Sequence, residues 1–288
     1  MFNKAVVDIG GTNTRFAIIE NNQIIFKEKF TTNPKNAFET LNKIIVLAQK
    51  FKIKTLAMCL PGPANYEQGI ILETPNLPSW SNLNVKQHLL NNSNIEQIIC
   101  ENDANAAALG AHRRYNKVGS YTQFFTLSTG FGGGLVINDQ IITGYNHQAQ
   151  EIAKLPLGPS SEPTFHLSPY ASEIYLSGSG WSLQAKEKGF NVTAKEILSD
   201  YHNNLKYAHE IVSNAIFTLT KVIATTACLI NPNLIVFSGP IAVNAPFIVE
   251  EAFAKAKQLM WASQTQVLDY KIDLLGEDLA LFGLHELI

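Results

Sequence analysis

A short sequence pattern occurs twice in the chain, so the fold must contain the same local structure in two places. "IIENNQII", Ile18 to Ile25, and "LVINDQII", Leu135 to Ile142, align residue for residue, and a glycine-rich turn precedes each copy: "DIGGTNT" before the first and "STGFGGG" before the second. Two apolar runs joined by Asn-Asn or Asn-Asp predict a β-hairpin, because these residues tolerate the positive φ angles of tight hairpin turns. A duplicated strand, glycine turn and hairpin predict two related halves that face each other.

The first third of the chain alternates short β-rich runs with amphipathic segments. This pattern predicts a mixed sheet flanked by helices, which is an α/β fold. The expected strands are Lys4–Ile9, Thr14–Glu20, Gln23–Phe30, Thr55–Leu60 and Ile95–Cys100. The expected helices are Lys35–Phe51, Val85–Asn91 and Ala104–Tyr115.

The second half of the chain predicts mainly helices around one buried strand. Asn231-Pro-Asn ends a long apolar helical stretch, a short apolar strand follows, and Ser238-Gly239-Pro240 forms the next turn. The expected helices are Pro169–Leu176, Gly180–Lys188, Thr193–Asp200, Leu205–Leu229, Ala245–Gln258 and Glu277–Leu287. Two further strands are expected near Gln266–Leu268 and Lys271–Leu275.

The length favours two domains, because 288 residues exceed the size at which a single core usually stops growing. We expect a smaller domain over residues 1–115 and a larger one over residues 116–275. The helix at Glu277–Leu287 has an apolar face that needs a partner. Residues 276–288 are therefore expected to return to the smaller domain.

Composition excludes several classes of protein. A net charge of -2 with 16% charged residues gives no large field of either sign, so we expect no nucleic-acid partner. Cys59, Cys100 and Cys228 lie far apart in apolar contexts, which favours buried thiols in a reducing compartment over disulfides or a metal site. No signal peptide and no membrane-spanning run are recognised, so we expect a cytoplasmic protein without a membrane partner.

Asp8 ends an apolar run and is followed closely by Gly10 and Gly11. A carboxylate there would point into the crevice that the turn makes, and the glycines let backbone N–H groups converge on an anion. A tight hairpin capped by Asp8 would show the same pattern. The second turn, Ser128 to Gly134, also consists of small residues. Because neither turn has the Walker A or dinucleotide spacing, we expect two facing hairpins to hold phosphates.

"CENDANAAALGA", Cys100 to Ala111, sets three polar residues in a row at the end of an apolar strand. Asp103 can cap a helix that opens with Ala104, but capping needs only one polar group. Asp103 could instead accept a proton from an attacking hydroxyl that Asn102 places through a hydrogen bond. The residues alone leave both interpretations open.

Two glutamates and two loops are weaker candidates for binding a ligand. Glu151 and Glu173 are more simply read as solvated helix residues. The loops "LPGPA", Leu60 to Ala64, and "TPNLPSW", Thr74 to Trp80, are consistent with a rigid wall for a polar ligand and equally with plain turns.

Taken together, these motifs resemble a known family. "DIGGTNTR", "PGP", "TPNLPSW", "ENDANAAALGA", "STGFGGG" and "SGP" occur in the order and spacing of the bacterial repressor/open-reading-frame/kinase (ROK) family of sugar kinases and the related bacterial glucokinases. The resemblance covers essentially the whole chain. It implies a duplicated actin-like ATPase (ribonuclease H-like) fold, with ATP in a cleft between two α/β domains, and a homodimer.

The resemblance also implies a role for each matching residue. Asp103 matches the catalytic base, and Asp8 would hold Mg²⁺ through water. The implied sugar-binding residues are Gly62, Asn76, Asn102, Asp103, Glu151 and Glu173. The implied nucleotide-binding residues are Asp8, Gly10, Gly11, Thr12, Thr129, Gly130 and Gly239.

The chain departs from the family pattern at two places. The family usually reads Gly-Glu-x-Gly-His around the first glutamate, whereas this chain has Gln150-Glu151-Ile152-Ala153-Lys154, with a lysine where the sugar-binding histidine is expected. The Cys-rich zinc signature of many members is absent and His166 alone cannot build a tetrahedral site, so no structural zinc is expected. The first strand begins within a few residues of Met1, which predicts no N-terminal helix-turn-helix and excludes the repressor branch.

These observations predict a Mg²⁺- and ATP-dependent hexose kinase in which Asp103 activates the 6-hydroxyl. Three alternatives stay open: an N-acylhexosamine kinase acting on N-acetylmannosamine or N-acetylglucosamine, a kinase of another small polyol, and a sugar- or nucleotide-binding regulator that kept the fold and lost catalysis.

Overall fold

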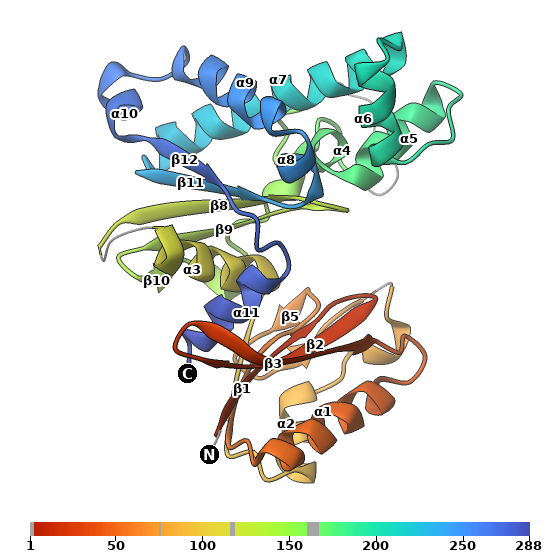
Figure 1. Ribbon diagram of the computed structural model, residues 1–288, viewed down its shortest axis with the longest axis vertical. Helices are drawn as coiled ribbons and strands as arrows, with labels where there is room; N and C mark the ends of the chain where they lie inside the picture. The colour runs from red at the N-terminus through yellow and green to blue at the C-terminus, as the bar shows by residue number, and fades with distance from the viewer. Residues whose placement is uncertain (1–2, 75, 116–118, 160–166) are drawn as a thin grey trace. The chain divides into compact units, whose positions relative to one another are not determined.

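The computed structural model describes residues 3–74, 76–115, 119–159 and 167–288. The chain divides into two compact units, which are described separately (Figure 1). Unit 1 consists of residues 1–115, 143–149 and 277–288, and unit 2 consists of residues 116–142 and 150–276. The segment Thr143–Ala149, which the sequence analysis left in the larger domain, thus belongs with unit 1.

Unit 1 is built on a five-stranded mixed sheet with the order β3-β2-β1-β4-β7. β1 pairs antiparallel with β2 and parallel with β4, which in turn pairs parallel with β7. Asn21 and Asn22, between β2 and β3, both have positive φ, so this predicted hairpin turn is confirmed. The strands are β1 (Lys4–Ile9), β2 (Asn13–Glu20), β3 (Gln23–Thr31), β4 (Thr55–Cys59) and β7 (Gln97–Glu101).

Helices cover both faces of the unit 1 sheet. α1 (Ala37–Phe51) and α2 (Val85–Asn92) lie on one face, and α11 (Asp278–His285), with α3 (Asp103–Tyr115) beside it, lies on the other (Figure 1). Ala5, Val7 and Ile9 share the core under α1. Because side chains alternate along a strand, Asp8 points to the opposite face, where α11 packs.

α3 and α11 approach each other unusually closely because glycines face backbone at their crossing. A Cβ atom on Gly283 would lie 1.7 Å from the carbonyl oxygen of Ala106, and one on Gly110 would lie 2.3 Å from that of Leu279. No side chain fits at either position, so these two glycines set the distance between the helices.

Among the residues described between β4 and α2, unit 1 contains three short elements that the sequence did not predict. They are β5 (Ala64–Asn65), β6 (Ile70–Ile71) and the 3₁₀ turn η1 (Pro78–Trp80). β5 and β6 form a separate small hairpin. Two- and three-residue elements are too short for hydrophobic periodicity to reveal.

Unit 2 repeats the sheet of unit 1. Its order, β10-β9-β8-β11-β12, has the same sequence of antiparallel and parallel pairs, so the duplication predicted from the repeat is confirmed. Asn138 and Asp139 also both have positive φ at the second hairpin turn. The strands are β8 (Tyr121–Leu127), β9 (Phe131–Ile137), β10 (Gln140–Ile141), β11 (Leu234–Ser238) and β12 (Asp269–Ile272).

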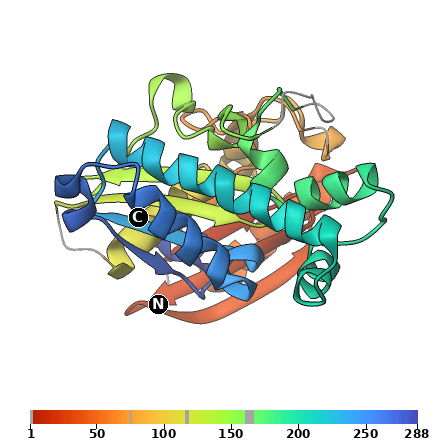
Figure 2. The same cartoon turned by 90° about the horizontal axis from the view of Figure 1, so that it is seen from above.

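The helices of unit 2 pack around α7 (Lys206–Leu229). Figure 2 shows α7 lying lengthwise over the unit 2 sheet with α9 (Pro246–Lys257) beside it. α7 is long and apolar enough to cross a membrane, which the sequence analysis did not recognise, but 67% of its most apolar window is buried within the protein. It is therefore a core helix.

The remaining elements are η2 (Tyr145–His147) in unit 1 and η3 (Ile152–Lys154), α4 (Ser172–Leu176), α5 (Gly178–Glu187), α6 (Ala194–His202), α8 (Pro240–Asn244) and α10 (Ala262–Val267) in unit 2.

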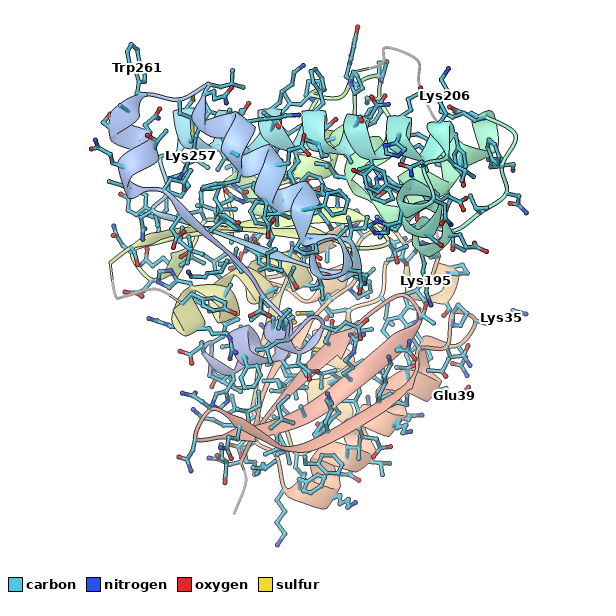
Figure 3. The ribbon with its side chains drawn as sticks, turned by 45° about the horizontal axis from the view of Figure 1, so that its top comes forward. Lys35, Glu39, Lys195, Lys206, Lys257 and Trp261 are labelled. Carbon is cyan, nitrogen blue, oxygen red and sulfur yellow. The ribbon has the colours of Figure 1, made fainter. Side chains whose placement is uncertain are left out.

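Two sequence predictions for unit 2 are wrong. The expected strand at Gln266–Leu268 is the end of α10, because Gln264 accepts a hydrogen bond from the Trp261 backbone and donates one to the carbonyl of Ala227, which ties this short helix to the end of α7. Trp261, just before α10, points outward into solvent (Figure 3). Cys228 is exposed rather than buried, because α7 leaves the core there, whereas Cys59 and Cys100 are buried as expected.

Candidate functional site

The turn between β1 and β2, Gly10 to Thr12, is fixed by hydrogen bonds at Gly10 and exposed at Gly11 and Thr12. Gly10 N–H donates to the carbonyl of Asn13 at 3.0 Å, and the Thr32 hydroxyl donates to the carbonyl of Gly10 at 2.8 Å. Gly11 and Thr12 are exposed, and their backbone N–H groups donate to no described residue. Two unpaired N–H groups on a fixed turn are suited to bind an anion.

Asp8 lies beneath this turn in a buried ion pair. Arg15, which faces Asp8 across the β1–β2 ladder, donates from Nη1 to Asp8 Oδ2 at 2.5 Å and also pairs with Glu277. Burial, and after it the charge of Asp103, raise the pKa of Asp8 to about 6, although Arg15 opposes the rise. A bound cation would offset the cost of this buried charge.

Asp103 is the first residue of α3 and its carboxyl is exposed. Loss of surrounding water raises the pKa of Asp103, and the Ala104 N–H and the Arg15 charge oppose that rise. Asn102 Oδ1 accepts from Ala104 N at 2.9 Å and from Asn105 N at 3.1 Å, so Asn102 supplies the helix cap. Asp103 is exposed as a residue, although the surrounding protein removes enough water from its carboxyl to raise the pKa.

Two residues that the sequence analysis did not single out fix the "END" segment. Glu101 is buried and accepts from Asn102 N at 2.8 Å and from Asn105 Nδ2 at 3.0 Å. Tyr66 is buried after β5, and its hydroxyl accepts from Asn102 Nδ2 at 3.3 Å. The third polar residue in the row, Glu101, was visible in the sequence, whereas nothing there indicated Tyr66.

The structure brings Gly62 to this group. A Cβ atom on Gly62 would lie 2.8 Å from the Tyr66 hydroxyl. Asn76 is exposed at the tip of a turn that Thr74 closes by donating from its hydroxyl to the carbonyl of Leu77 at 2.8 Å.

In unit 2 the corresponding turn joins β8 to β9 through Ser128, Thr129 and Gly130. Ser128 N–H donates to the carbonyl of Gly130 at 2.9 Å, and the start of α5 anchors the turn through Gly178 N–H, which donates to the Ser128 carbonyl at 2.7 Å. The N–H groups of Thr129 and Gly130 donate to no residue within the described ranges. Glu173 lies beside this turn, since a Cβ atom on Gly130 would be 3.3 Å from its Oε1.

Gly239 lies between β11 and α8 and closes the same end of the unit 2 sheet. Its φ is +92°, and a Cβ atom there would lie 2.5 Å from the carbonyl oxygen of Leu127 and 3.0 Å from Thr126 Oγ1. Only glycine fits this backbone position.

Comparison with known proteins identifies the family. Residues 4–288 match the ROK family. An N-acetyl-D-glucosamine kinase of Mannheimia succiniciproducens is 29% identical over 283 residues, covering 91% of each chain, and a glucokinase of Halalkalibacterium halodurans is 25% identical over 305 residues, covering 96% of this chain and 92% of the relative. The fold resembles that of a Streptomyces griseus ROK glucokinase solved with glucose and AMPPNP, with a TM-score of 0.78, 20% identity and coverage of 99% and 98% of the two chains.

The chain belongs to the ROK family. It has the two-domain α/β, actin-like ATPase fold of the ROK sugar kinases, as the resemblance of its motifs implied.

The departure of this ROK protein around Glu151 has a structural counterpart. Gln150, where the family usually has glycine, has a φ of +65°, and its Oε1 accepts from Gln123 Nε2 at 2.7 Å. Ile152 is buried, and a Cβ atom on Gly133 would lie 2.6 Å from its Cδ1. These contacts anchor Glu151 from both sides and leave its side chain and that of Lys154 exposed.

The residues of this ROK protein fit a nucleotide with its metal. Arg15 occupies only Oδ2 of Asp8, so Oδ1 is left for a water on Mg²⁺, a cation that prefers oxygen ligands. In each unit, the two unpaired N–H groups of the turn fit phosphate oxygens. No group of three or more His, Cys, Asp or Glu side chains suited to a metal occurs within the described part of the chain, and His166 lies outside it.

The sequence-predicted residues therefore form one group in each unit. Unit 1 gathers the turn Gly10–Thr12 and the residues Asp8, Gly62, Asn102 and Asp103. Unit 2 gathers Thr129, Gly130 and Glu173 with Gly239 at the end of the neighbouring strand. Asn76 and Glu151 are exposed.

Proposed function

We propose that this ROK protein is an ATP-dependent hexose kinase that transfers the γ-phosphoryl group to the 6-hydroxyl of a glucose-like sugar. The observation that carries the proposal is the group at the start of α3. There an exposed carboxyl, Asp103, follows an asparagine whose amide is held in one orientation.

Asp103 acts as the general base. Its Oδ1 accepts the Ala104 N–H, so Oδ2 takes the proton of the attacking hydroxyl. The raised pKa of Asp103 suits this role, because it makes the carboxylate a better proton acceptor than an ordinary aspartate. Phosphoryl transfer passes through a loose transition state, so positioning of the hydroxyl contributes much of the acceleration.

The remaining groups bind the two substrates. The N–H groups of Gly11, Thr12, Thr129 and Gly130 bind phosphate oxygens, and Gly239 leaves room for the nucleoside. Asp8 holds Mg²⁺ through water, and that ion, when bound, neutralises charge on the phosphates. Gly62, Asn76, Asn102, Glu151 and Glu173 bind the other sugar hydroxyls. The reaction takes place in the cytoplasm, where ATP and hexoses are available.

Replacement of Asp103 by asparagine tests this function. We expect kcat to fall about 10²-fold or more, the usual size of a general-base effect, while the sugar still binds. The assay follows phosphorylated sugar directly, and Asp269→Asn, an exposed carboxylate in unit 2, is the matched control with unchanged kcat. An Asp103→Asn protein that phosphorylates sugars at the normal rate would contradict the proposal.

An N-acylhexosamine kinase is the second candidate. Lys154 stands where the family has a sugar-binding histidine, and one 29% identical relative is an N-acetyl-D-glucosamine kinase. Parallel assays with glucose, fructose, mannose, N-acetylglucosamine and N-acetylmannosamine decide between the two classes. ATP consumption that does not depend on any sugar would instead favour a regulator that kept the fold.

A further inference from the structure

The Tyr66 hydroxyl lies among residues assigned to the acceptor in unit 1. It accepts from Asn102 Nδ2 at 3.3 Å. The same oxygen would lie 2.8 Å from a Cβ atom on Gly62. Asp103 and Glu101 are near enough for their charges to raise the pKa of Tyr66, in addition to its burial. The hydroxyl therefore lies within the group that contains the proposed base.

The position of this hydroxyl is fixed from several directions. The ring of Tyr66 is buried in the unit 1 core. The turn that follows it is closed by Gln68 N–H, which donates to Asn65 Oδ1 at 3.0 Å, and the His147 ring lies 5.7 Å from the Tyr66 ring. A phenol held this firmly loses little conformational entropy when it forms one more hydrogen bond.

The hydrogen-bonding capacity of the Tyr66–Asn102 pair is only partly used. The Tyr66 oxygen accepts from Asn102, but its own proton is donated to no residue among those described. Asn102 uses Oδ1 for the cap of α3 and one Nδ2 proton for Tyr66, which leaves one Nδ2 proton. Two donors thus remain side by side next to Asp103.

Packing alone does not explain the hydroxyl. A phenylalanine ring would fill the same buried volume, and a hydroxyl whose proton is not donated gives less free energy than one that both accepts and donates. A ligand oxygen that accepts this proton would supply that second hydrogen bond.

We propose that Tyr66 is a further acceptor-binding residue, whose hydroxyl donates a hydrogen bond to an oxygen of the acceptor sugar beside Asn102. The proposal rests on the proposed kinase function. It assigns Tyr66 to recognition of a sugar oxygen other than the one that Asp103 deprotonates, because Tyr66 donates and the base accepts. Tyr66 therefore contributes to affinity and to the choice of sugar, and not to the chemical step.

The test is Tyr66→Phe, which keeps the ring. Loss of one neutral hydrogen bond should raise the KM for the sugar about 3- to 10-fold, with kcat and the KM for ATP unchanged. The sugar-induced rise in Tm should shrink in parallel, which reports binding without turnover. Tyr207→Phe is the control, because that tyrosine is also buried and its hydroxyl donates to Asp200 within unit 2.

Deoxy analogues of the preferred sugar identify the contacted oxygen. Wild type should discriminate against one analogue, and Tyr66→Phe should lose that discrimination while keeping the others. A variant with the wild-type KM for the sugar and full discrimination would overturn the role of Tyr66 and leave the kinase function standing. A wild type that neither binds nor phosphorylates any sugar would overturn both.

Discussion

The two glycine turns share a backbone frame and differ in chemical content. Each follows the central strand of its sheet, β1 or β8, and leads into an antiparallel strand, and each leaves two N–H groups without a described partner. The unit 1 turn covers a buried Asp–Arg ion pair. The unit 2 turn has Thr126 where unit 1 has Asp8, the last residue but one of the strand, and is closed by Gly239.

The comparison shows that the two units share their strand pairing and differ in the charge of the side chains at the strand ends. The order and direction of the strand pairs and the two-residue turns at Asn21-Asn22 and Asn138-Asp139 are the same in both units. The glycine turn differs in length, because four residues lie between the paired Ile9 and Thr14 and three between the paired Leu127 and Phe131. Charge was free to diverge, because the side chains at the strand ends are not needed to hold the sheet. Both turns offer two backbone N–H groups to an anion, and unit 1 adds the buried carboxylate of Asp8, which suits a cation.

Among the substitutions that compare the two turns, removal of Arg15 from the unit 1 turn should cause the largest loss in the free energy of unfolding. Arg15→Met leaves Asp8 buried beside Asp103 without a cation, and breaking a buried pair costs about 3–5 kcal/mol in the free energy of unfolding. Urea unfolding measures the loss. Lys43→Met, which breaks an exposed pair with Glu28, should cost about 1 kcal/mol or less. Equal effects of the two substitutions would show that the unit 1 turn does not depend on its charges.

Substitution of Gly239 tests the dependence of the unit 2 turn on space. Gly239→Ala combines a positive φ with a Cβ atom 2.5 Å from the Leu127 carbonyl, so we expect a loss of about 2–4 kcal/mol in unfolding free energy. Gly276→Ala also has a positive φ but open space around the added methyl, and should cost about 1 kcal/mol. Chemical denaturation compares the pair, and equal losses would remove the steric argument.

A smaller effect is expected from pH, because the unit 1 turn has the titrating carboxyl of Asp8 and the unit 2 turn has Thr126 in its place. The pKa of Asp8 is raised from 3.8 to about 6, so the folded state holds its proton more tightly than the unfolded state. The free energy of unfolding should therefore fall as pH rises from about 4 to about 6, by about 2–3 kcal/mol for this group. Urea unfolding at several pH values should show this decrease reduced in Asp8→Asn. An unchanged profile would show that Asp8 titrates normally.

The sequence predicted the parts of the fold that depend on local pattern. β1, α1 and α7 were found because their apolar spacing is regular over many residues, and the two hairpins because Asn21-Asn22 and Asn138-Asp139 are turn residues between apolar runs. The end of α10 was mistaken for a strand because the helix is short and is tied to the end of α7 by a distant partner, the Ala227 carbonyl.

The candidate site was predicted only where a residue type alone indicates chemistry. Asp8, Asn102 and Asp103 follow apolar strands in the sequence, and the structure places them at the ends of β1 and β7. Arg15, Glu101 and Tyr66 were missed because their importance lies in contacts between separate elements. Such contacts depend on strand register and helix placement, which periodicity does not specify.

The close crossing of α3 and α11 has a consequence for biosynthesis. α11 is translated only after the whole of unit 2, yet it covers one face of the first sheet and meets α3 through Gly110 and Gly283. While the ribosome is still making unit 2, the nascent first unit must expose the apolar surface that α11 will later cover. We expect this half-finished state to be the point at which chaperones and proteases compete for the polypeptide.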